Sequence, residues 1–64
     1  MFEVIYRYRR SGQIQDLKIA TLERAMSLAA LNFRESIEPI YIKTNDKIYD
    51  TNDMRNYIKV HNIQ

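Results

Sequence analysis

The side chains that could do chemistry in this chain are few and widely spaced. The single histidine, His61, lies on the apolar stripe of a C-terminal helical segment, where a structural role is far more common than a catalytic one. No serine stands in a glycine-framed turn that would expose a nucleophile. The chain has one glycine, so it has no glycine-rich loop to hold a phosphate. We therefore predict that the protein is not an enzyme.

Three aspartates near the C-terminus, Asp46, Asp50 and Asp53, raise the question of a metal site. A calcium loop of the EF-hand type needs alternating oxygen ligands, a central glycine and a terminal glutamate. The glycine and the glutamate are missing here, and Ile48 and Tyr49 stand in the middle. Turn and helix-capping roles explain the aspartates, and a chain without cysteine has no zinc-ligand set. We expect neither a metal nor a cofactor.

The strongest candidate for a binding surface is the alternating segment Tyr6, Arg7, Tyr8, Arg9 and Arg10. Period-two alternation predicts a strand with the tyrosines on one face and Arg7 and Arg9 on the other. Exposed tyrosines would stack on the bases of single-stranded nucleic acid, and exposed arginines would contact a protein partner or phosphates. Alternatively, the segment is a solvated edge strand whose arginines discourage pairing with other chains, which explains the tyrosines and the arginines without a binding partner. Of the two functions we favour protein binding, with single-stranded nucleic acid as the alternative.

The elements that must position these residues follow from the hydrophobic periodicity. Gly12 marks a hairpin turn, Thr21 is a helix N-cap, and Pro39 separates the first helix from a second hairpin. The pattern predicts one small α+β domain over 1–64, in the order β-β-α-β-β-α, with antiparallel hairpins packed against two helices. The predicted strands are about 2–9, 14–20, 40–43 and 47–50, and the predicted helices are about 22–34 and 52–62.

Two leucines of the first predicted helix do not fit its core stripe. Leu31 projects opposite that stripe, and Leu28 flanks it on the same outer side. Either a neighbouring element covers them, or they form an apolar patch that faces a partner. A domain of about 60 residues buries only about 60% of its unfolded surface. Small size and these leucines together predict a possible homodimer.

Composition and charge narrow the function classes. Ten basic and eight acidic residues give a net charge of +2, and the acidic residues spread through the second half argue against a uniformly basic nucleic-acid groove. The longest nearly apolar run, 25–31, is too short for the roughly 20 residues of a membrane span. Charged residues near the N-terminus do not suit a secretion signal. We expect a cytoplasmic protein that does not enter the membrane.

The first half of the chain also carries a resemblance. A short strand ending in alternating tyrosine and basic residues, the turn Ser11-Gly12, a return strand and the helix opening Thr21-Leu22-Glu23-Arg24-Ala25 cover residues 2 to about 34. This layout resembles small uncharacterised proteins of bacteriophages and mobile elements of low-GC bacteria. The resemblance implies an accessory protein that binds and modulates a host protein. It assigns no functional residue.

Overall fold

Six elements follow one another in the predicted order, in a computed structural model that describes residues 3–63. Each predicted strand and helix is present, so the predicted α+β class is confirmed for the described residues. Residues 1, 2 and 64 lie outside the description, and with them the predicted start of the first strand at residue 2. The elements are β1 (Val4–Arg10), β2 (Gln13–Ile19), α1 (Leu22–Phe33), β3 (Glu38–Lys43), β4 (Ile48–Tyr49) and α2 (Thr51–Val60).

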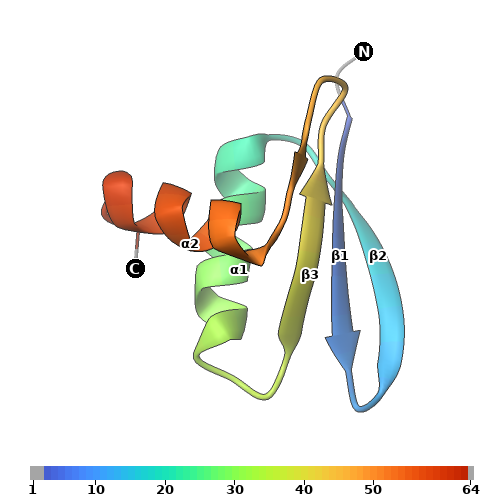
Figure 1. The fold of residues 1–64 in the computed structure, drawn as a ribbon. Helices are drawn as coiled ribbons and strands as arrows, with labels where there is room; N and C mark the ends of the chain where they lie inside the picture. The colour runs from blue at the N-terminus through green and yellow to red at the C-terminus, as the bar shows by residue number, and fades with distance from the viewer. Residues whose placement is uncertain (1–2, 64) are drawn as a thin grey trace.

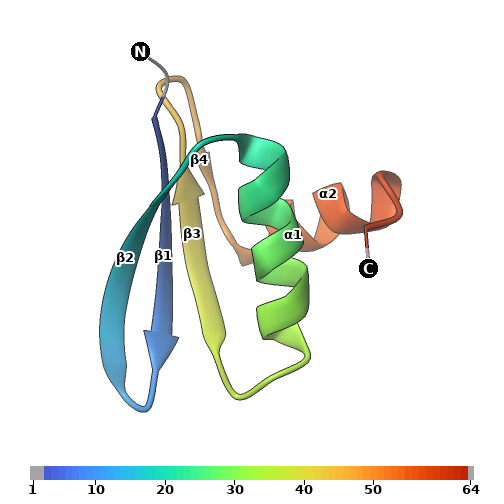
Figure 2. The same cartoon turned by 180° about the vertical axis from the view of Figure 1, so that it is seen from behind.

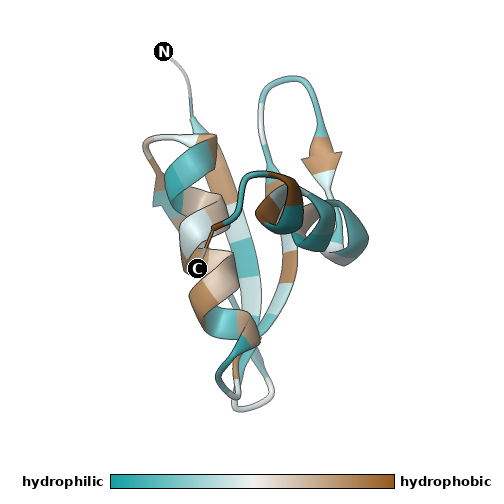
Figure 3. Cartoon of the chain, turned by 90° about the vertical axis from the view of Figure 1, so that its left-hand side faces the viewer, coloured by the Kyte–Doolittle hydropathy of each residue, from teal (hydrophilic) through white to brown (hydrophobic). Residues whose placement is uncertain are grey.

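The four strands form one antiparallel sheet in the order β2-β1-β3-β4. Both helices pack on the same face of this sheet (Figure 3). No helix or strand described within residues 3–63 covers the opposite face, which we call the open face. In two opposite views α1 lies along β3, while β2 is on the side away from α2 (Figure 1, Figure 2). The interpretation of the Tyr-Arg segment as an edge strand is wrong, because β3 pairs with the second side of β1.

The β1–β2 hairpin is closed by a two-residue turn. Ser11 and Gly12 both have positive φ, 53° and 80°, the signature of a type I′ turn, whose twist matches that of the flanking strands. The predicted turn is confirmed, although Ser11 shares the left-handed backbone expected of Gly12 alone. The β1–β2 register runs without a shift from Arg10↔Gln13 to Val4↔Ile19.

The register shift lies instead between β1 and β3, at Arg7 and Tyr8. Pro39 pairs with Tyr8 beyond this shift, so β3 begins at Glu38 rather than at Ile40 as predicted. A proline has no N–H to give to a ladder, and bulges are among the few places where a sheet accepts one.

Both helices begin at the predicted caps. Thr21 Oγ1 accepts a hydrogen bond from the Arg24 N–H at 3.2 Å. At α2, Asp50 accepts from the Asp53 N–H at 2.8 Å while the Asp53 carboxylate accepts from the Asp50 N–H at 3.3 Å, a complete capping box. Neither helix described within residues 3–63 is long and apolar enough to cross a membrane.

One layer of wholly buried side chains joins the sheet to the helices. Its members come from β1, α1, β3 and α2, and are Val4, Tyr6, Ala25, Met26, Ala29, Ile42 and Met54. The Tyr6 hydroxyl donates a 2.6 Å hydrogen bond to Asn32 Oδ1, and Asn32 is only 5% exposed. Burial, with a smaller contribution from Tyr8, raises the pKa of Tyr6. The buried polar atoms of the sheet and of α1 thus satisfy one another.

Candidate functional site

The tyrosines of the Tyr-Arg segment belong to the core side of the sheet. Tyr6 is wholly buried, and Tyr8 is half-buried and stacks on it with ring centroids 5.4 Å apart. The prediction that Tyr6 contacts a partner is wrong, because β1 is an interior strand that lies beneath the helices. The platform for base stacking that required both rings at the surface is therefore not formed.

The arginines of the same segment lie on the open face, where carboxylates of neighbouring strands meet them. Arg7 forms a bidentate pair with Asp16, with Nε–Oδ1 at 2.7 Å and Nη2–Oδ2 at 3.0 Å, and its guanidinium lies 4.9 Å from the Tyr41 ring centroid. This hydrogen bonding lowers the pKa of Asp16 and raises that of Arg7. Arg9 Nη1 lies 3.8 Å from Glu38 Oε2, which forms a second cross-strand ion pair.

Cross-strand pairing therefore balances much of the charge on the open face. Lys18 adds a third pair, 3.5 Å from Glu3. Arg10, next to the turn, is exposed. A surface that binds phosphates needs cations that protein carboxylates have not already neutralised. The open face is accordingly a weak candidate for a site that binds phosphates.

The two leucines of α1 have different environments. Leu28 is half-buried and packs against the core, as expected if a neighbouring element covers it. Leu31 is 50% exposed. It precedes Arg34 by three residues, so the two side chains are neighbours on the helix surface. Of the predicted apolar patch, Leu31 is thus the more accessible member.

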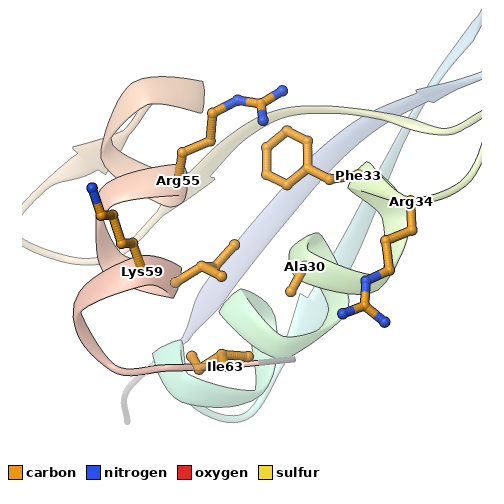
Figure 4. A pocket seen from close by; sticks show the side chains of 7 residues that line it. Ala30, Phe33, Arg34, Arg55, Lys59 and Ile63 are labelled. Atoms are coloured by element: carbon orange, nitrogen blue, oxygen red, sulfur yellow. The ribbon is translucent and has the colours of Figure 1, made fainter.

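A groove between α1 and α2 combines apolar and cationic side chains, a combination that the predicted sites lack. Its volume is about 280 Å³, and its apolar lining consists of Ala30, Phe33, Ile58 and Ile63 (Figure 4). Binding sites for drug-sized molecules are usually about 300–1,000 Å³. The groove is therefore close to the lower limit of this range.

The end of α2 shapes one wall of this groove. After α2 the chain turns at Asn62, whose φ is 53°, and the Ile63 N–H donates to the Ile58 carbonyl at 3.0 Å. The Asn62 N–H donates to the Lys59 carbonyl at 3.3 Å. These two bonds form a Schellman motif, which brings an apolar residue after the helix back onto its last turn. That motif places Ile63 beside Ile58 in the lining.

Three cations surround the apolar lining: Arg34, the C-cap residue of α1, and Arg55 and Lys59, which are one turn apart on α2 (Figure 4). All three residues are exposed. The Arg55 guanidinium lies 4.1 Å from the centroid of the Phe33 ring, a cation–π contact that holds it at the edge of the groove. Within residues 3–63, none of the three forms an ion pair with a carboxylate.

The charge changes sign beyond the Phe33–Arg55 contact. A second hollow shares these two residues and carries Glu35 and Glu38 on its wall. The cationic region is therefore bounded on one side by carboxylates, which confines an anionic ligand to the end near Arg34 and Lys59.

The remaining chemistry-bearing side chains have structural partners. His61 is exposed and stacks on Tyr57, with ring centroids 4.1 Å apart. Within residues 3–63 no three histidine, cysteine or acidic side chains are grouped as metal ligands would be. The perturbed pKa values of Tyr6, Arg7 and Asp16 arise from burial or from a cross-strand ion pair.

The residues of the groove are not among those predicted from the sequence. The sequence does contain one indication of the groove. Arg55 and Lys59 are four residues apart and Ile58 is three residues after Arg55, so these side chains are neighbours on the surface of the helix. Comparison with protein-family models, with curated proteins and with solved structures finds no match for this chain. The function must therefore be inferred from the chemistry of the surface.

Proposed function

We propose that this protein is a non-enzymatic binding module that holds an acidic, amphipathic segment of a partner protein in the α1–α2 groove. The observation that carries the proposal is the apolar lining with Arg34, Arg55 and Lys59 around it. An apolar side chain of the partner would enter the groove, and its flanking carboxylates would meet the cations. Apolar anchors surrounded by a polar rim are the usual anatomy of protein interfaces.

Charge supports a protein partner over a nucleic acid. The cationic cluster is small and adjoins Glu35 and Glu38, so it does not continue into a basic track along which a phosphate backbone could run. The apolar lining would gain nothing from phosphates but would gain from a leucine or phenylalanine of a peptide. Holding such a segment would modulate the protein that contains it, which is the role that the resemblance to phage proteins implies.

A peptide of known composition tests this proposal. The probe is a fluorescein-labelled helical peptide of about 12 residues, with leucines at i and i+4 and glutamates on either side, a length that spans about 18 Å. We expect saturable binding by fluorescence anisotropy at low salt, weakening as salt is added. A peptide with the same leucines and lysines in place of the glutamates should bind at least tenfold more weakly.

Charge reversal locates the binding. Arg34→Glu combined with Lys59→Glu should weaken binding of the acidic peptide by about tenfold or more, since exposed ion pairs each contribute about 0.2–1 kcal/mol and reversal adds repulsion. The matched control is Arg24→Glu, at an exposed position of α1 that does not line the groove. Equal affinity for the two peptides, or equal loss in the control, would contradict the proposal.

A further inference from the structure

The outer edge of β2 is open along its length. Its partner in the sheet is β1, and six of its seven residues, all but Ile19, are exposed. Natural edges are commonly protected by a proline, a bulge, charged side chains or a covering element, and of these β2 has two exposed charges of opposite sign, Asp16 and Lys18. β2 has no proline, its pairing with β1 has no register shift, and α1 leaves Ile14 and Leu17 exposed at 55% and 41%.

The β1–β2 hairpin determines which backbone groups face this edge. A two-residue type I′ turn makes its flanking residues, Arg10 and Gln13, a hydrogen-bonded pair. Antiparallel strands alternate bonded and non-bonded pairs, so Gln15, Leu17 and Ile19 also bond to β1. The N–H and C=O groups of the intervening residues, Ile14, Asp16 and Lys18, consequently point away from β1. A further strand could pair with them.

We propose that the occupant of this edge is the β2 strand of a second copy, paired antiparallel about a two-fold axis at Leu17. The Asp16 and Lys18 side chains lie on the open face, since they pair with Arg7 and Ile5 of β1. With the axis at Leu17, Asp16 of each copy lies opposite Lys18 of the other. The two Leu17 side chains meet on the helix side. Two four-stranded sheets then become one continuous sheet.

The charges of β2 favour pairing about an axis at Leu17 over pairing about an axis at either adjacent residue. An axis at Asp16 would place two aspartates opposite each other, and an axis at Lys18 would place two lysines opposite each other. Like charges directly across a strand pair are destabilising, whereas opposite charges contribute about 0.2–1 kcal/mol. The axis at Leu17 gives Asp16 and Lys18, which pair with Arg7 and Glu3 within each chain, a further partner of opposite charge in the other copy, together with an apolar contact. The dimer uses no residue of the α1–α2 groove, so it stands independently of the proposed function.

The amide protons of β2 give a direct test. We expect analytical ultracentrifugation of the whole chain to show a monomer–dimer equilibrium, and NMR hydrogen exchange to show a concentration-dependent slowing at Asp16 and Lys18. The amides of Gln15 and Leu17, which bond to β1, should be protected at every concentration. A monomer at about 1 mM, or a dimer in which the Asp16 and Lys18 amides still exchange rapidly, would overturn the proposal.

Substitutions at Lys18 distinguish the effect of side-chain charge on dimerisation from the effect of backbone hydrogen bonding. Lys18→Glu should weaken dimerisation by about tenfold or more, because both opposite-charge pairs become repulsive, while Lys43→Glu, an equal change on β3, should leave it intact. Lys18→Pro removes the N–H that faces the edge and should abolish the dimer, whereas Lys18→Gln, which keeps that N–H, should retain it. Should Lys18→Pro fail to fold, the exchange pattern of the unmodified chain still decides.

Discussion

Tyr6→Phe removes one oxygen atom, and we expect it to cost far more stability than the removal of a hydroxyl from the surface of this chain. The hydroxyl donates to Asn32 Oδ1 at 2.6 Å, and both residues are almost completely buried. The Tyr6 hydroxyl is the side-chain donor to Asn32 Oδ1, whereas the Asn32 amide nitrogen donates to Glu35 Oε1 at 3.3 Å, so the substitution leaves the oxygen without its donor. A buried polar group left unsatisfied costs about 1–3 kcal/mol. The free energy of unfolding should therefore fall by about 2 kcal/mol.

Thermal denaturation followed by circular dichroism measures this loss. In domains of 60–100 residues each kcal/mol shifts the Tm by about 4–8 °C, so Tyr6→Phe should lower it by roughly 8–16 °C. The matched control is Tyr41→Phe, which removes a hydroxyl from a half-buried ring of the open face and keeps the ring that faces Arg7. That control should stay within about 0.5 kcal/mol of the unmodified chain.

A double-mutant cycle isolates the hydrogen bond from the other effects. Asn32→Leu replaces the acceptor by an apolar side chain, and adding Tyr6→Phe to it should cost less than Tyr6→Phe alone, because no unsatisfied oxygen remains. We expect a coupling energy of about 1 kcal/mol or more between the two sites. If Tyr6→Phe leaves the Tm unchanged, or if the two losses simply add, the reasoning about this buried pair is refuted.

Three other predictions concern local structure. Asp50→Ala should destabilise the fold by about 1 kcal/mol in urea denaturation, since it removes half of the α2 capping box. Gly12→Ala should cost about 1–2 kcal/mol by the same assay, because its φ of 80° is strained for a residue with Cβ. The hydrogen bond to Arg7 lowers the pKa of Asp16 in the folded state. The contribution of Asp16 to the free energy of unfolding should therefore be complete above about pH 4 and should disappear as the pH falls through the lowered pKa. Asp16→Asn should flatten this part of a curve of stability against pH.

Local signals in the sequence predicted most of the fold. Gly12, Thr21 and the pair Asp50 and Asp53 mark a turn and two helix starts through interactions within a few residues, and each lies where it was expected. The start of β3 was missed because Pro39 was assigned to the break that separates the first helix from the second hairpin. Here a register shift between β1 and β3, set by distant residues, accommodates Pro39.

The candidate site depends on long-range packing, and the sequence predicted little of it. Alternation showed that Tyr6 and Arg7 face opposite ways, but only the packing of the two helices on one face of the sheet decides which of them is buried. The groove requires that Phe33 of α1 meet Arg55 of α2, a contact between residues far apart in the chain. No periodicity within either helix contains that information.

The most direct test of the account is an NMR titration of the labelled protein with the acidic leucine peptide. The largest chemical-shift changes should fall on Ala30, Ile58 and Ile63, the apolar lining of the groove, and should be lost in the variant with Arg34→Glu and Lys59→Glu. Changes confined to the open face around Arg7, or a titration with no saturable change, would contradict the claim that the α1–α2 groove is the binding site.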